Sequence, residues 1–514
     1  MNDIGIDLGT TYSCVMHCLP DGQEQIVPTA EGGELTPSVV YFDEDESVVV
    51  GGQAKGMLAK DPDNVVVGIK RHMGEDYPLE FHGKKFTPEA ISGIVLKRLA
   101  LDAAEFFHVD RSLLQAVITV PAYFGVAEKE ATYAAARIAE LTCLELLAEP
   151  VAAAYAYGAD PNVNDSSLVF DLGGGTFDVA IVGMVSGQPK IWAVDGETQL
   201  GGLDWDRRLN DVLWDRLVTQ GIDEDAIFDE EFTGALMREA ELLKRNLSVH
   251  DSGTARLSFG GKTYSVSVTR DVFEEVTKDL VAQCMAAAHR VVSTAGSLGA
   301  RPISRVLLVG GSTRMMMIRR GMESEFGVPV LIHDPDKAVA RGAAILASKL
   351  SQKPGGIALA SSQVKRITPV LPKGIGIKVY SSQLPPRPEP YVMNILPANT
   401  PLPVSGKDVT VATIVKDQDT ARIELYEQAG STLSERIGDN RLLFDGQISG
   451  IPAGPAGSPI ALTIVVEIDG RISVSAAMGK TRVPLNLEAF IHGVIDEQEF
   501  DEQASNVSSL IMAR

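Results

Sequence analysis

Two short segments of this chain carry carboxylates, glycines and hydroxyls in the same order. The first is Asp7-Leu8-Gly9-Thr10-Thr11, and the second is Asp171-Leu172-Gly173-Gly174-Gly175-Thr176, with Asp178 close behind. Each follows a short apolar run. Glycine-rich turns direct several backbone N–H groups into one concavity, which suits a phosphate group. Carboxylates at the strand ends would repel phosphate unless a Mg²⁺ ion and its water shell lay between them. The two segments therefore predict a pair of loops that bind a polyphosphate with Mg²⁺.

Both segments belong to a longer repeat. Asp7 and Asp171 are 164 positions apart (171 minus 7), and each is followed by a β-type segment, a turn and a third β-type segment. The second and third segments are 13–18 and 25–27 in the first copy, and 177–182 and 190–194 in the second. A three-stranded meander that occurs twice predicts two related subdomains that face each other.

The remaining pattern divides the chain into a long α/β part and a shorter all-β part. Helical and strand patterns alternate through residues 1–350, which favours an α/β fold. Residues 351–366 are small and polar and are interpreted as a linker. Short strand patterns separated by turns fill residues 367–487 and predict a small β-sandwich. A helical segment is expected near Leu487–Phe500, in a short helical tail at 488–514.

Composition narrows the class of protein. The chain has 514 residues and a formal net charge of −22, so nucleic acid and anionic membranes are not expected as partners. Four cysteines do not make a disulfide framework, and no 18-residue apolar run or secretory leader is visible. We therefore expect a cytoplasmic protein.

Several longer segments resemble a known family. With the two loops, "VLLVGGSTRMMMI" at 306–318 resembles the superfamily of actin, sugar kinases and heat-shock chaperones. The resemblance narrows to the seventy-kilodalton, DnaK-like heat-shock chaperones in four segments: "GIKRHMG" (68–74), "AVITVPAYF" (116–124), "AEPVAAAYAYG" (148–158) and "LGGLDWD" (200–206). Residues 395–403 and 450–477 resemble that family's peptide-binding sandwich. The resemblance implies a two-lobed actin-like ATPase fold with duplicated subdomains, followed by a small all-β sandwich domain.

The resemblance also implies roles for single residues. Asp7 and Asp171 would bind Mg²⁺ through water, Lys70 would reach the γ-phosphate, Glu149 would orient the attacking water, and Thr176 would donate to the γ-phosphate. The cofactors would be ATP or ADP with Mg²⁺, and K⁺ is a candidate for a second bound cation. The other residues expected around the nucleotide are Gly9, Thr10, Thr11, Tyr12, Gly173, Gly174, Gly175, Asp178, Gly201, Gly202, Glu241, Lys244, Arg245, Ser248, Gly310, Gly311, Ser312, Arg314 and Asp336.

The implied function is that of an ATP-dependent chaperone that hydrolyses ATP slowly and binds extended apolar segments of unfolded proteins. A J-domain co-chaperone and a nucleotide exchange factor are implied as further partners. The residues expected at the peptide site are Ile377, Val379, Tyr380, Val411, Ile414, Ala421 and Ile423.

Three departures from the family pattern keep an alternative open. The linker "GGIALASSQVKRIT" (355–368) lacks the family's acidic residue and leucine run, and Glu145 stands where the family uses arginine for the J-domain contact. Only 27 residues follow Leu487 (514 minus 487), so we expect short helices and no helical lid. The alternative is a nucleotide-regulated binding protein with one dedicated partner and little turnover. A small-molecule kinase is less favoured because of the β domain and because no sugar pocket is evident in the sequence. A filament-forming actin relative is less favoured because the β domain would obstruct head-to-tail stacking.

Overall fold

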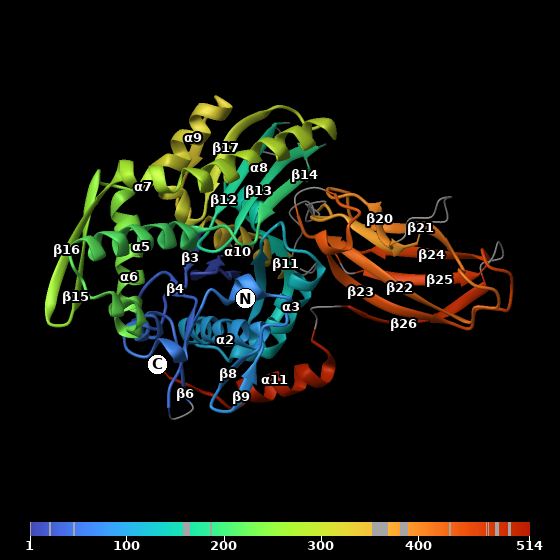
Figure 1. Cartoon of the computed structure of the whole chain (residues 1–514), viewed down its shortest axis with the longest axis horizontal. Helices are drawn as coiled ribbons and strands as arrows, with labels where there is room; N and C mark the ends of the chain where they lie inside the picture. The colour runs from blue at the N-terminus through green and yellow to red at the C-terminus, as the bar shows by residue number, and fades with distance from the viewer. Residues whose placement is uncertain are drawn as a thin grey trace.

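The computed structural model describes residues 2–19, 22–44, 47–157, 165–185, 188–351, 369–380, 389–430, 433–468, 470, 472–478, 483–491 and 495–513. Apart from Ser351, the expected linker at 351–366 lies outside the described residues. Figure 1 shows a two-lobed α/β part on one side and an all-β part on the other, with helix α11 beneath the first lobe.

The first lobe is built on a sheet with strand order β11-β10-β1-β2-β3. Strands β1 and β2 form an antiparallel hairpin, and β1 pairs in parallel with β10. The short strand β4 pairs with β2 beside this path. The strands are β1 (Asp3–Asp7), β2 (Tyr12–Cys18), β3 (Glu24–Ile26), β4 (Thr36–Pro37), β10 (Gln115–Val120) and β11 (Thr142–Ala148).

The second lobe repeats this topology. Its sheet has the order β14-β13-β12-β17-β18, in which β12 and β13 form the hairpin and β12 pairs in parallel with β17. The strands are β12 (Ser166–Leu172), β13 (Phe177–Val185), β14 (Gln188–Glu197), β17 (Ile303–Val309) and β18 (Val330–Ile332). The expected duplication of a three-stranded meander is therefore confirmed, and each lobe completes it with two parallel strands.

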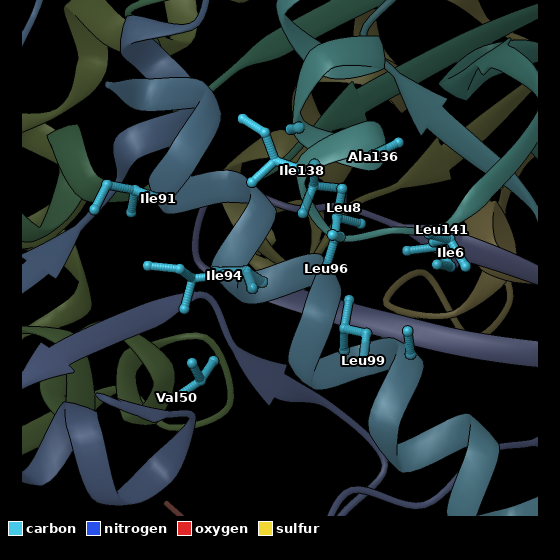
Figure 2. Packing of buried hydrophobic residues seen from close by; sticks show 14 of the residues in the cluster. Ile6, Leu8, Val50, Ile91, Ile94, Leu96, Leu99, Ala136, Ile138 and Leu141 are labelled. Atoms are coloured by element: carbon cyan, nitrogen blue, oxygen red, sulfur yellow. The ribbon is translucent and has the colours of Figure 1, made fainter. Parts of the chain in front are cut away.

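Helices pack around these sheets, and the central ones are largely buried. Helix α2 (Pro88–Phe107) begins where the Thr87 hydroxyl accepts a hydrogen bond from Ala90 N, as the Thr-Pro pair predicts. Figure 2 shows Ile94 and Leu99 of α2 in one apolar cluster with Ile6 of β1 and Ile138 of α3. The other helices at the centre are α3 (Val126–Ile138), α4 (Glu149–Ala156) and α10 (Ala338–Ser351). These packed layers hold the two hairpin turns at fixed positions.

Smaller subdomains extend each lobe. On the first lobe they comprise α1 (Gly52–Gly56), β5 (Val39–Phe42), β6 (Ser47–Val50), β7 (Val65–Val67), β8 (Leu79–Phe81) and β9 (Lys84–Phe86). On the second lobe they comprise α5 (Gly202–Thr219), α6 (Glu230–Leu247), β15 (Ser252–Phe259), β16 (Lys262–Thr269) and α7 (Arg270–Val276). Helices α8 (Lys278–Ser297) and α9 (Met316–Phe326) belong to the main body of that lobe, where α8 packs against β13 and β14 and α9 packs against α8 and β18.

The all-β part is an antiparallel structure with the strand order β20-β19-β22-β23-β26-β25-β24-β21. Strand β26 pairs with β23 along its second half and with β25 along its first, so it passes from one sheet to the other. The strands are β19 (Ile375–Val379), β20 (Tyr391–Leu396), β21 (Val404–Ala412), β22 (Thr420–Gln428), β23 (Asn440–Ser449), β24 (Pro459–Val466), β25 (Ile472–Met478) and β26 (Val483–Ile491). The expected β-sandwich is confirmed.

The two parts share core residues at their junction. Val126 of helix α3 packs in the apolar core of the β domain, and Val370 of the β domain packs in a core cluster of the α/β part. The Asn399 side-chain oxygen also accepts a hydrogen bond of 2.7 Å from Val194 N. The β domain is therefore docked against both lobes, at helix α3 of the first lobe and at strand β14 of the second.

The end of the described chain returns to the first lobe. The helix expected near Leu487–Phe500 is wrong in its first part, because Leu487 lies in strand β26 and helix α11 spans Glu497–Ser509. Val507 and Leu510 are buried in the core cluster of that lobe. Strand β27 (Ile511–Met512) then pairs in parallel with β6. The C-terminal segment is thus part of the first lobe and does not cover the β-sandwich.

Candidate functional site

The two glycine turns meet between the lobes. A Cβ atom on Gly174 would lie 2.1 Å from the Thr11 hydroxyl oxygen, and one on Gly175 would lie 2.2 Å from Thr10 Cγ2. Glycine is therefore required at both positions by the close approach of the facing loop. The sequence predicted two loops that face each other, and the structure places them in direct contact.

The carbonyl groups of the second turn are turned away from the first. Gly173 O accepts hydrogen bonds from Gly202 N at 2.9 Å and from the Ser312 hydroxyl at 2.8 Å, and Gly174 O accepts one from Leu203 N at 2.8 Å. In a trans peptide the following N–H points opposite to its carbonyl. The N–H groups of Gly174 and Gly175 are thereby directed to the opposite side of the turn, which forms an anion-binding concavity.

Lys70 and Glu149 form a buried ion pair beside this concavity. Lys70 Nζ lies 2.8 Å from Glu149 Oε1, and both side chains are less than 10% exposed. Burial by itself would lower the pKa of Lys70, but the neighbouring charges of Glu149 and Asp7 raise it. Lys70 is therefore a cation at neutral pH, and a carboxylate that could orient water is held against it.

Four carboxylates converge here around that one ammonium group. Burial, followed by the charge of Glu149, raises the pKa of Asp7 to about 7 and that of Asp178 to about 8, and the same causes raise the pKa of Asp171 well above its usual range. Such a set of oxygen donors suits a divalent cation, which would restore their charge. Among the described residues, no three acidic, His or Cys side chains lie close enough together to ligate one metal ion directly.

A second polar cluster closes the far end of the space between the lobes. Lys55 Nζ of the first lobe lies 2.5 Å from Glu241 Oε2 of helix α6 and donates to the Tyr12 hydroxyl at 2.9 Å. Arg245 Nη2 donates to the same hydroxyl at 2.8 Å and to Glu241 Oε1 at 2.7 Å. These contacts connect one lobe to the other across the opening.

A cavity of about 700 Å³ runs between the two clusters, a volume typical of small-molecule and cofactor sites. The structure brings most of the predicted nucleotide residues to its walls. Those that line it are Asp7, Gly9, Thr10, Thr11, Tyr12, Lys70, Glu149, Asp171, Gly173, Gly174, Thr176, Glu241, Lys244, Arg245, Ser248, Gly310, Gly311, Ser312, Arg314 and Asp336.

Four predicted residues lie immediately behind this wall. Gly175 and Gly201 pack against each other, since a Cβ on Gly201 would lie 2.6 Å from Gly175 N. Gly202 contributes its N–H to Gly173 O, as described above. Asp178 accepts a hydrogen bond of 2.8 Å from Tyr123 N, in the loop that follows strand β10. These four residues shape the site from outside the cavity.

The residues predicted to bind peptide lie together in the β domain. Ile377 and Ile423 are buried in its core, and Val379, Val411 and Ala421 pack against that core. Tyr380 and Ile414 are 62% and 68% exposed, so they present apolar surface to solvent.

Several contacts at the site were not predicted from the sequence. Thr119 donates to Asp7 Oδ1 at 3.1 Å from the neighbouring strand β10, and Lys55 pairs with Glu241. Lys244 of helix α6 donates to Asp206 Oδ2 of the preceding helix α5 at 2.8 Å. No local motif marks these pairs, because their members are distant in the sequence. Thr119 lies on strand β10, which pairs in parallel with β1, the strand that ends at Asp7. Recognising that these two strands are neighbours would have placed Thr119 beside Asp7.

This geometry defines a two-lobed nucleotide-binding protein of the actin-like fold, extended by a β-sandwich. The family model described as "Hsp70 protein" matches residues 3–81 and 77–509. The chain is 36% identical over 484 residues to the protein named chaperone protein DnaK of Thermotoga neapolitana and to that of Thermotoga maritima. Each alignment covers 92% of this chain and 78% of the relative. The chain belongs to the Hsp70 family.

Proposed function

We propose that this protein is an ATP-dependent molecular chaperone that hydrolyses ATP slowly and binds extended apolar segments of unfolded proteins. The observation that carries the proposal is the contact between two glycine turns, beside a buried Lys70–Glu149 pair, at one end of a cavity of about 700 Å³. Relatives that carry the name chaperone protein DnaK support the same function. They do not favour the alternative of a regulator with one dedicated partner.

In the proposed reaction the protein positions ATP and water and does little covalent chemistry. The N–H groups of the glycine turns and the Thr10, Thr11 and Thr176 hydroxyls would hold the phosphates. Lys70 would neutralise charge at the terminal phosphate, and Glu149 would orient the attacking water and accept its proton. The ribose and base would lie farther along the cavity, between helix α6 and the Gly310–Arg314 segment.

Mg²⁺ would be held through its waters by Asp7 and Asp171, with Asp178 completing the network. A bound Mg²⁺ neutralises phosphate charge that would otherwise oppose hydrolysis. K⁺ as an additional cation remains part of the proposal.

The β domain would bind peptide by strand addition together with side-chain pockets. The exposed Tyr380 and Ile414 would contact the peptide from above, and Val379, Val411 and Ala421 would border the pockets. Small side chains at Val411 and Ala421 would give wide pockets with a broad apolar preference.

A J-domain co-chaperone and a nucleotide exchange factor are proposed as further partners, although Glu145 on strand β11 gives the expected J-domain surface a reversed charge. In the part of the chain that the structure describes, no helix is long and apolar enough to cross a membrane. A cytoplasmic location stays a prediction.

Single-turnover ATP hydrolysis, with and without a panel of unfolded peptides, tests the proposal. We expect slow hydrolysis that many different apolar peptides accelerate. Hydrolysis that no peptide in the panel changes would contradict the chaperone function, and a single tight ligand in a peptide-binding screen would favour a dedicated regulator. A protein that binds ATP and never hydrolyses it would contradict the ATPase.

A further inference from the structure

Arg71 is a buried cation of the first lobe that does not line the nucleotide cavity. It follows Lys70 in the short 3₁₀ segment Ile69–His72, and its side chain is 5% exposed. Successive side chains of a 3₁₀ segment diverge by about 120°, so the two cations leave the segment in different directions. Lys70 contacts Glu149 within its own lobe, whereas Arg71 reaches the second lobe.

The Arg71 guanidinium makes two hydrogen bonds there. Its Nε donates to Gly175 O at 2.8 Å, and its Nη2 donates to Asp204 Oδ2 at 2.6 Å. The same Asp204 oxygen accepts from Gly201 N at 2.8 Å, at the beginning of helix α5. Two donors of one planar group therefore connect the second glycine turn to the helix behind it.

With this contact, the carbonyl oxygens of all three glycines in the second turn accept a hydrogen bond. The carbonyl oxygens of Gly173 and Gly174 are held by groups of the second lobe, as described above, whereas the Gly175 carbonyl is held by Arg71 of the first lobe. Because the Gly175–Thr176 peptide is trans, fixing the Gly175 carbonyl fixes the Thr176 N–H in the opposite direction. The last donor of the turn therefore depends on a residue from across the cleft.

We propose that Arg71 is a positioning residue for hydrolysis, which orients the Gly175–Thr176 peptide only when the two lobes are together. The inference rests on the proposed ATPase function. When the lobes close, Arg71 would bond the Gly175 carbonyl and thereby align the Thr176 N–H with the terminal phosphate. Lys70 would then act on the terminal phosphate directly, while Arg71, its neighbour in the chain, would orient the Thr176 N–H of the second lobe toward the same phosphate.

The test compares Arg71→Ala, Arg71→Lys and Asp204→Asn with the wild type in single-turnover ATP hydrolysis and in ADP binding. We expect Arg71→Ala to lower kcat about 10- to 100-fold, the range for a small misplacement of reacting groups. The ADP dissociation constant should change much less. Arg71→Lys should recover only part of the rate, because lysine lacks the fork that serves two acceptors.

A matched control separates positioning from stability. Arg98 is also buried in the first lobe, where it pairs with Asp102 on helix α2. Arg98→Ala should lower the midpoint of urea unfolding and leave kcat within about twofold of the wild type. If Arg71→Ala does not fold, Arg71→Lys and Asp204→Asn carry the test, and both should lower kcat more than they raise the ADP dissociation constant.

Equal kcat for the wild type and the Arg71 variants would overturn the inference while leaving the ATPase intact. A loss of kcat in Arg98→Ala as large as in Arg71→Ala would also overturn it, because the effect would then follow stability. A wild type without hydrolysis would remove the proposed function first, so the two failures are distinguishable.

Discussion

The ammonium group of Lys373 in the β domain lies 3.4 Å from the carboxylate of Glu128 on helix α3, and both side chains are buried. Glu427 lies 3.8 Å from the same ammonium, and Arg441 donates to Glu128 Oε1 at 2.9 Å. Lys373 is also 5.0 Å from the ring centre of Tyr123, whose N–H is bonded to Asp178. A buried ion cluster at the domain junction therefore contacts the loop that holds a residue of the candidate site.

Removal of Lys373 should separate the domains. Lys373→Ala leaves Glu128 and Glu427 close together and buried with less compensating charge, which costs about 3–5 kcal/mol for a buried pair. We expect a lower midpoint of urea unfolding and a larger radius of gyration in solution scattering. Lys278→Ala is the control, since its pair with Glu275 is exposed on both sides and should cost less than about 1 kcal/mol. An unchanged radius and midpoint in Lys373→Ala would contradict the structural role of the cluster.

Lys70→Ala and Thr176→Ala should retain nucleotide binding and lose most turnover. Both groups are placed to act on the terminal phosphate, where removal of one stabilising donor costs about 100-fold or more in kcat. Single-turnover hydrolysis and ADP binding by fluorescence measure the two effects. Lys262→Ala, in an exposed hairpin on the second lobe, is the matched control and should behave as the wild type. Normal turnover in both site variants would mean that the reaction occurs elsewhere or by other groups.

The loops of the site could be predicted because their chemistry is local. Asp171 at a strand end and three glycines after it suffice to indicate a turn that binds phosphate, and a second copy at Asp7 indicates the partner lobe. The contacts across the cleft could not be predicted in this way. Lys55 and Glu241 are 186 positions apart, and Arg71 and Gly175 are 104 positions apart, so only the folded lobes bring them together.

The sequence prediction also failed where a periodicity was misread. Leu485, Leu487, Ala489 and Ile491 alternate every second position, which is typical of a strand, and they lie in β26. The helix begins only at Glu497, after Asp496 accepts a hydrogen bond from Glu499 N as its N-cap. The docking of α11 on the first lobe has no local signal, because it depends on apolar surface that helices α2 and α3 provide.

The C-terminal segment should contribute to the stability of the first lobe. Leu510 is 7% exposed within the core cluster, so Leu510→Ala should lower the free energy of unfolding by about 2–5 kcal/mol. Its neighbour Ile511 is 68% exposed, so Ile511→Ala is the control. We expect Ile511→Ala to lower the free energy of unfolding by less than about 1 kcal/mol. Urea denaturation of both variants measures the difference. Similar values for the two would mean that the segment does not pack on the lobe in solution.

The ion pair between the lobes should weaken in acid. Burial by itself would raise the pKa of Glu241, but the charges of Lys55 and Arg245 lower it below its usual range. The folded state therefore binds this proton less readily than the unfolded state, so the pair stabilises the protein above about pH 4.3 and loses that effect as the pH falls further. Stability differences between the wild type and Glu241→Gln, measured by urea unfolding from pH 7 to 3.5, should shrink in acid.

A matched pair on the surface serves as the reference for that titration. Arg319 and Glu323 are about half exposed and one helical turn apart, so Glu323→Gln should change stability by less than about 0.5 kcal/mol at every pH. If the stability difference between the wild type and Glu241→Gln stayed constant through the same pH range, the charge of Glu241 beside Lys55 would not contribute to stability. The contact between the lobes would then depend on the hydrogen bonds to Tyr12, and the Tyr12→Phe variant should carry the loss instead.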